Sequence, residues 1–119
     1  MRYVWVGLAG AVGTLLRYTI GLNVDQARFP WATLAINLSG AFILGLFLTL
    51  ALGRVSADVM TPVAVGLLGG YTTFSTFAWE SFTMGRGGRP VTAVIYVGVS
   101  VIGGLCAAGT GYATGRALR

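Results

Sequence analysis

The chain has 119 residues, of which 55% are hydrophobic and only 9% are charged, and its mean hydropathy is +0.80. These values exclude an ordinary soluble domain and are typical of an integral membrane protein. Because one crossing of the bilayer takes about 20 apolar residues, we expect four crossings in a single membrane domain over residues 1–119, with no separate soluble domain.

The charged residues and the missing residue types restrict the function further. The chain has eight arginines and no lysine, and its acidic residues are Asp25, Asp58 and Glu80, so its net charge is +5. A basic chain can bind nucleic acid, but most of these arginines fall at the ends of apolar segments, where they reach lipid headgroups. Histidine is absent and Cys106 is the only cysteine, so the usual groups of nucleophilic or acid–base catalysis are missing. We expect neither an enzyme nor a nucleic-acid-binding protein.

The first predicted span covers residues 3–22. No small-residue cleavage site precedes the next apolar segment, so this span is interpreted as retained rather than as a signal peptide. Gly7, Gly10 and Gly13 recur at helical spacing and predict a face for close helix contact. Arg17, near the far end, has two interpretations: a snorkelling anchor, or a positive charge at the mouth of an aqueous vestibule.

The second predicted span covers residues 31–52 and begins directly after Pro30, which suits the first turn of a helix. Its one strongly polar side chain is Asn37. A buried amide needs hydrogen-bond partners, so this side chain faces protein or water rather than lipid. This side chain either forms a hydrogen bond between helices, a common use of asparagine in bundles, or directs an N–H donor at a permeating anion.

The third predicted span covers residues 61–84 and is broken at 69–73. The break combines two glycines with two β-branched threonines, which weaken a helix, and its hydroxyls offer the freed backbone groups other partners. A break at membrane depth is tolerated where it is buried in protein or lines a wet cavity, and there it often holds an ion. A glycine-rich packing kink is the alternative, but Phe74 and Phe77 directly after the break favour a functional site.

The fourth predicted span covers residues 91–114. Tyr96 and Ser100 are four residues apart and Gly104 follows four residues later, so all three fall on one stripe of the helix. A polar stripe on an apolar helix either packs against other helices or forms a track for a partly desolvated ion.

Four spans place both termini and the second loop on one side of the membrane. The arginines of that side are Arg2, Arg54, Arg116 and Arg119, and those of the other side are Arg28, Arg86 and Arg89. Orientation follows Lys/Arg asymmetry, and four against three is almost none, so both orientations should insert. Four short spans bury little surface alone, so we also expect an oligomer.

The run Gly-Gly-Tyr-Thr-Thr-Phe-Ser-Thr-Phe at residues 69–77 resembles the signature of the Fluc (CrcB) fluoride channels. The resemblance covers the whole chain and includes Leu-Arg-Tyr at 16–18 and Ile-Asn-Leu-Ser-Gly at 36–40. It implies an all-α membrane protein with four transmembrane helices, the third broken at its middle, in an antiparallel dual-topology homodimer. It further implies two fluoride pores, one central structural sodium ion, and a place in the cell inner (plasma) membrane, where the channel exports fluoride passively and lowers cytoplasmic fluoride.

The resemblance also implies roles for individual positions. The implied fluoride pore residues are Asn37, Phe74, Phe77, Ser75, Thr76, Tyr96 and Ser100. Arg17 matches the vestibule arginine, and the backbone carbonyls of Gly69 and Thr72 match those that hold the sodium, which is structural and not transported. Glu80 matches a family glutamate whose role stays open. Gly104 stands where some relatives have serine, so that end of the polar track has no hydroxyl in this chain.

Two other functions are alternatives to a fluoride channel. A small multidrug transporter has similar length and four spans, but its proton coupling needs a carboxylate within the first span, and here that span has no acid. A structural subunit of a membrane complex would explain the glycines. It would not explain a hydroxyl-rich break beside two phenylalanines.

Overall fold

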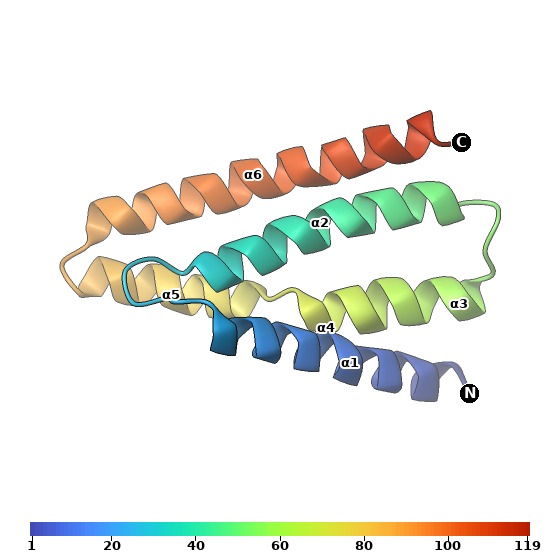
Figure 1. Ribbon diagram of the computed structural model, residues 1–119, viewed down its shortest axis with the longest axis horizontal. Helices are drawn as coiled ribbons and strands as arrows, with labels where there is room; N and C mark the ends of the chain where they lie inside the picture. The colour runs from blue at the N-terminus through green and yellow to red at the C-terminus, as the bar shows by residue number, and fades with distance from the viewer.

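The computed structural model describes residues 1–119, which form helices and connecting loops without any strand. In chain order the helices are α1 (Arg2–Asn23), α2 (Trp31–Ala51), α3 (Ala57–Thr61), η1 (Pro62–Leu68), α4 (Gly69–Tyr71), α5 (Phe74–Arg86) and α6 (Pro90–Ala117). The predicted all-α class is confirmed. Both termini lie at the same end of the elongated molecule, beside the loop that joins α2 to α3 (Figure 1).

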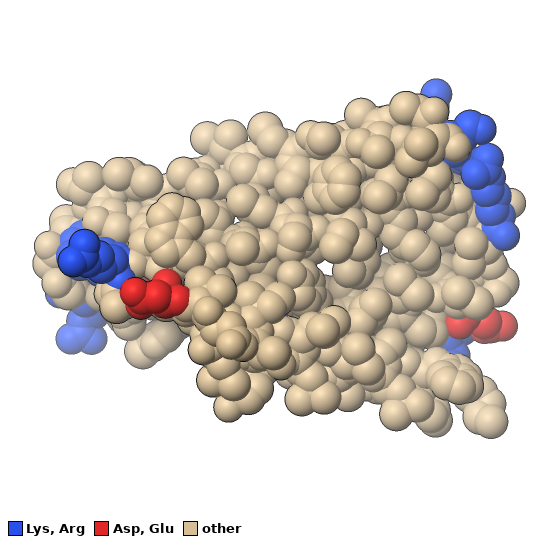
Figure 2. Space-filling view, in the orientation of Figure 1, with Lys and Arg blue, Asp and Glu red and all other residues tan.

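Three helices, α1, α2 and α6, are long and apolar enough to cross a membrane. Each has at least 21 residues, and a helix of that length rises about 30 Å, the thickness of a bilayer's hydrocarbon core. The charged side chains gather at the two ends of the long axis and leave an uncharged band between them on the face shown in Figure 2. The fold is therefore that of a helical, multi-pass membrane protein.

The segment from α3 to α5 forms a fourth row of helix, divided near the middle of the molecule (Figure 1). α4 ends at Tyr71 and α5 begins at Phe74, and the two residues between them are extended, with ψ of 160° at Thr72 and 116° at Thr73. The non-helical stretch is thus narrower than the expected 69–73. Gly69 and Gly70 stay helical, because glycine in a helix costs only about 1 kcal/mol.

The turns of η1 are wider than those of an α-helix, a feature that was not predicted from the sequence. η1 is a seven-residue π-helix that starts at Pro62. Proline lacks the N–H that would continue the α-helical ladder, and π-helical turns are one way for the backbone to adjust. These wide turns lead directly into α4 and therefore into the extended Thr72 and Thr73. We call these two residues, with the helix ends on either side of them, the interruption.

Helices α1 and η1–α4 pack backbone to backbone through glycines. A Cβ atom added at Gly70 would lie 2.6 Å from the Gly10 carbonyl oxygen, and one added at Gly13 would run into the Leu67 carbonyl. Gly7, by contrast, has nothing within 4 Å of such an atom. Of the three glycines expected on the contact face of the first span, Gly10 and Gly13 therefore lie in the close contact and Gly7 does not. This contact brings the last turns of α1 against the end of α4.

Candidate ion site

The carboxamide of Asn37 in α2 holds the backbone of the interruption at two points. Its Nδ2 donates to the Thr73 carbonyl at 3.0 Å, and the Thr73 N–H donates to its Oδ1 at 2.8 Å. In an unbroken helix the Thr73 N–H would instead donate to the Gly69 carbonyl. The asparagine therefore replaces a missing turn of helix, and one of its two amide hydrogens remains for another partner.

The side chain of Thr73 begins α5 as its N-cap. Its Oγ1 accepts from the Thr76 N–H at 3.3 Å, and threonine is among the residues favoured at this position because its oxygen satisfies an unpaired N–H of the first turn. A regular helix would have directed the Thr76 N–H to the Thr72 carbonyl. The carbonyls of Gly69 and Thr72 have thus both lost their helical partners.

Beside the interruption lies a cavity of about 280 Å³, the phenylalanine cavity, which α2, α5 and α6 help to line. Its lining residues are Asn37, Thr72, Thr73, Phe74, Phe77, Ser100 and Val101. The Ser100 hydroxyl is the one buried side-chain oxygen or nitrogen in the chain without a hydrogen-bond partner. A buried polar group without a partner is costly and points to a missing ligand or water.

Aromatic rings form one wall of this cavity. The centroids of Phe74 and Phe77 lie 5.7 Å apart, and Phe77 meets Tyr96 at 5.2 Å with its ring plane tilted by 61°. Ring edges carry the positive part of the aromatic quadrupole, so they can face an anion. The Phe74 side chain is 78% exposed in the single chain, so the cavity wall is open on that side.

Glu80 of α5 lies among hydroxyl groups that come from two other helices. Thr33 Oγ1 in α2 donates to one carboxylate oxygen at 2.8 Å, and the Tyr96 hydroxyl in α6 donates to the other at 2.7 Å. These bonds tie α2, α5 and α6 together at one point. Because a phenol has a single proton, Tyr96 has none left for an ion while it donates to Glu80.

A second, smaller hollow of about 120 Å³ lies on the Arg17 side of the interruption, and only two of its nine lining residues are hydrophobic; we call it the Arg17 hollow. Its lining residues are Arg17, Gly21, Gln26, Ala32, Thr33, Ile36, Thr73, Thr76 and Glu80. Arg17 donates through Nε to the Gly70 carbonyl at 3.2 Å. It has no carboxylate within 4.0 Å, since the chain's one ion pair joins Arg2 and Asp58. Thr73 lines both hollows, so the interruption forms the wall between them.

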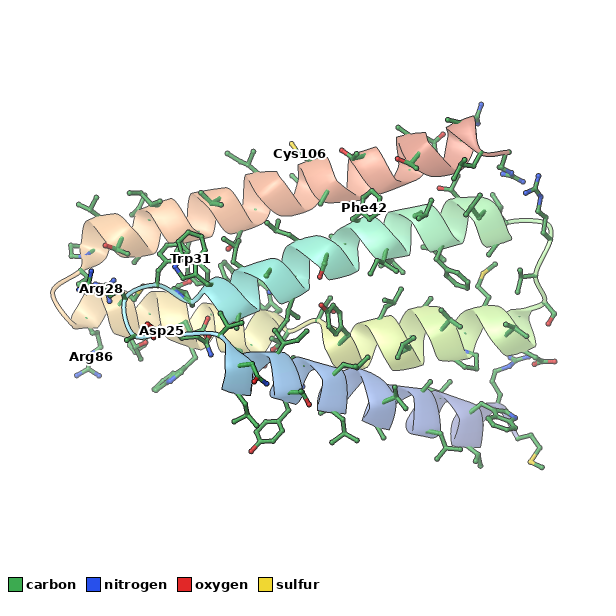
Figure 3. The ribbon with its side chains drawn as sticks, in the orientation of Figure 1. Asp25, Arg28, Trp31, Phe42, Arg86 and Cys106 are labelled. Carbon is green, nitrogen blue, oxygen red and sulfur yellow. The ribbon has the colours of Figure 1, made fainter.

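Few charged groups lie near these two hollows, and most charged side chains lie elsewhere in the molecule (Figure 3). The labelled Asp25, Arg28 and Arg86 all lie toward the end of the molecule where α5 meets α6, away from the middle where α4 ends and α5 begins. The charged groups that do reach the interruption region are Arg17 and Glu80, and both line the Arg17 hollow rather than the phenylalanine cavity. The two hollows therefore differ in charge as well as in size.

The family model described as "CrcB-like protein, Camphor Resistance (CrcB)" matches residues 4–112, nearly the whole chain. The chain belongs to this family. The resemblance predicted from the 69–77 signature is therefore confirmed.

Similar curated proteins support the assignment to the CrcB family. The chain is 44% identical to the fluoride-specific ion channel FluC of Thermus thermophilus, over 98% of this chain and 97% of that protein. It is 40% identical to FluC of Acidobacterium capsulatum, with the same coverage, and 42% identical to FluC 2 of Moorella thermoacetica, over 94% of each chain. These relatives are named as channels and not as enzymes.

The predicted pore residues of this CrcB-family chain do not all line the same cavity. Four of them line the phenylalanine cavity: Asn37, Phe74, Phe77 and Ser100. Thr76 lines the Arg17 hollow instead, together with Arg17 and Glu80. Ser75 is exposed, and Tyr96 is fully buried and lines neither. A pattern of hydroxyls along one helix cannot distinguish these environments, because they depend on which helix packs opposite.

Two residues of this CrcB-family site were not predicted from the sequence. Thr33 supplies one of the two hydrogen bonds to Glu80, and Thr73 bonds to Asn37 through its backbone and caps α5 through its side chain. Thr33 stands one helical turn before Asn37, so its place on the same face of α2 was a usable signal. Thr73 lay within the expected break, but nothing local indicates its long-range partner.

Proposed function

We propose that this protein is a channel that conducts fluoride passively and selectively across the membrane and so lowers cytoplasmic fluoride. The observation that carries the proposal is the buried, unpartnered Ser100 hydroxyl, which faces the same cavity as Asn37 and the two phenylalanines. Family membership supports it, since the similar proteins from three bacteria are named fluoride-specific ion channels.

The lining of the phenylalanine cavity suits a small anion that is partly stripped of water. The Ser100 hydroxyl, the free amide hydrogen of Asn37 and the phenylalanine ring edges are compact, neutral groups that can replace hydration water. No arginine lines this cavity. Conduction requires binding that is weak enough for release, so neutral donors serve it better than a full positive charge.

The proposed pore forms at the interface of an antiparallel homodimer in the inner (plasma) membrane, in which α3 to α5 make a third, broken crossing. Phe74 is 78% exposed in the single chain, and a second copy would cover this open side of the cavity. The four-to-three distribution of arginines leaves insertion almost unbiased. Labelling of cysteines introduced near Arg54 should occur from both sides of the membrane, and labelling from one side only would contradict the dual topology.

A structural sodium ion fits the carbonyls that the interruption leaves free. The Thr73 and Thr76 N–H groups, the regular partners of Gly69 and Thr72, donate to side chains instead. Unwound backbone carbonyls are known ligands of sodium in membrane proteins. Two copies of this pair would hold one ion, whose positive charge would link the two subunits. Sodium should raise the melting temperature of the purified protein more than a large organic cation does; equal melting temperatures would exclude the site.

Fluoride efflux from liposomes tests the proposed function directly. Purified protein in vesicles loaded with potassium fluoride or potassium chloride should release fluoride when a potassium ionophore is added, and should release little chloride. Equal release of both anions would contradict selectivity. Release of neither would favour the structural-subunit interpretation, and proton-coupled movement of an organic cation would favour a multidrug transporter.

Ser100→Ala is expected to separate stability from conduction. The hydroxyl makes no hydrogen bond in the protein, so its removal relieves a buried unsatisfied group and should leave the melting temperature unchanged or higher. Fluoride efflux should fall several-fold, because one donor to the ion is lost; a neutral hydrogen bond is worth about 1 kcal/mol. Thr110→Ala, at an exposed hydroxyl of α6 that bonds to the Cys106 carbonyl, is the matched control. Undiminished efflux in Ser100→Ala would remove this hydroxyl from the ion's path.

A further inference from the structure

The Arg17 side chain ends on the backbone of the interruption. Its Nε donates to the carbonyl of Gly70, the next-to-last residue of α4. In an unbroken helix the Phe74 N–H would donate to this carbonyl, but Phe74 begins a separate helix, α5. The last carbonyls of a helix need other partners, and an arginine side chain provides both a donor and a favourable charge there.

The close packing of α1 on α4 positions Arg17 for this bond. Gly13, one helical turn before Arg17, is buried against the backbone of Leu67 and Tyr71. Such a backbone contact leaves little freedom for the next turn of α1. The arginine is therefore directed at one carbonyl and is not free to snorkel to the membrane surface. A snorkelling anchor was one of the two interpretations of its sequence position.

We propose that Arg17 is a positioning residue that caps α4 and so sets the backbone path from Gly70 to Phe74. Arg17 acts from the α1 side, while Asn37 holds the Thr73 backbone from the α2 side. Together the two side chains determine which carbonyls of the interruption stay unpaired and where Phe74, the first residue of α5, is placed. The proposal rests on the proposed function only where fluoride efflux is the readout.

Three substitutions separate this capping role from a purely electrostatic role. The capping atom is Nε, and the Nε2 of glutamine stands the same number of bonds from Cα, so Arg17→Gln keeps a donor in place and removes the charge. Arg17→Lys keeps the charge but moves the donor one bond further out. Arg17→Met has similar length and neither donor nor charge. Arg2→Met, which also breaks the exposed ion pair with Asp58, is the control for loss of one positive charge away from the interruption.

The initial rate of fluoride efflux from liposomes should stay near wild type in Arg17→Gln and Arg2→Met. It should fall about tenfold in Arg17→Met and clearly in Arg17→Lys, as expected for the loss of the hydrogen bond to the Gly70 carbonyl. Hydrogen–deuterium exchange of residues 69–77 should rise in Arg17→Met but not in Arg17→Gln. This second readout reports backbone order independently of conduction.

The opposite ranking would overturn the proposal: wild-type efflux in Arg17→Lys with loss in Arg17→Gln would assign Arg17 to electrostatic attraction of anions. Wild-type efflux and exchange in all three variants would overturn it as well. If Arg17→Met does not fold, the comparison of glutamine with lysine still decides. If the wild-type protein conducts no fluoride, the proposed function fails, and the exchange of residues 69–77 alone decides whether Arg17 caps α4.

Discussion

Asn37→Asp is expected to reduce fluoride efflux at least tenfold. Aspartate has nearly the same shape as asparagine but has no amide hydrogens, so the bond to the Thr73 carbonyl is lost and an ionised oxygen faces that carbonyl oxygen instead. The same change puts a negative charge in the wall of the phenylalanine cavity. Loss of a buried hydrogen bond that leaves its acceptor unpaired lowers the free energy of unfolding by about 1–3 kcal/mol. The carboxylate also repels the permeating anion, so fluoride efflux should fall strongly.

Asn23→Asp provides the matched control for this prediction. Asn23 is exposed at the end of α1, and its Nδ2 donates to the Thr19 carbonyl within the same helix. The chemical change is identical, and both variants alter the net charge by one unit, but only Asn37 touches the interruption. Efflux from liposomes should be near wild type in Asn23→Asp. Wild-type efflux in Asn37→Asp would move the ion path away from α2.

Phe77→Ile is expected to reduce fluoride efflux about tenfold while the protein remains folded. Isoleucine keeps an apolar side chain but has no ring edge to face the anion, and it ends the contacts of Phe77 with both Phe74 and Tyr96. Each aromatic pair is worth about 0.5–1.5 kcal/mol beyond the area that it buries. Loss of two pairs should also let the Tyr96 ring shift and disturb its bond to Glu80.

Phe82→Ile is the control for loss of an aromatic ring in the same helix. Phe82 is exposed, contacts Trp79 and Arg86, and lines neither hollow. Its substitution should leave fluoride efflux near wild type. Phe74→Ile belongs in the same experiment, because Phe74 forms the exposed edge of the cavity. Wild-type efflux in both Phe74→Ile and Phe77→Ile would remove the phenylalanine rings from the mechanism.

The fold class and the family followed from local features of the sequence. Apolar runs of about 20 residues predict helices long enough to cross a bilayer, and helices occur at each of the three longest runs. The signature at 69–77 identified the family, because that combination of glycines, hydroxyls and phenylalanines is specific. Gly10 and Gly13 were also expected in a close helix contact, and the structure has that contact.

The tertiary structure decided which groups remain available to an ion. Asn37 and Thr73 stand 36 positions apart, and Thr33 and Glu80 stand 47 apart. The period of a helix predicts which residues share a face, but it does not predict which face of another helix lies opposite. For that reason the sequence indicated Tyr96 as a pore hydroxyl, whereas the packing of α6 on α5 directs its proton to Glu80. The same long-range contacts leave Ser100 without a partner and the Gly69 and Thr72 carbonyls without their helical donors.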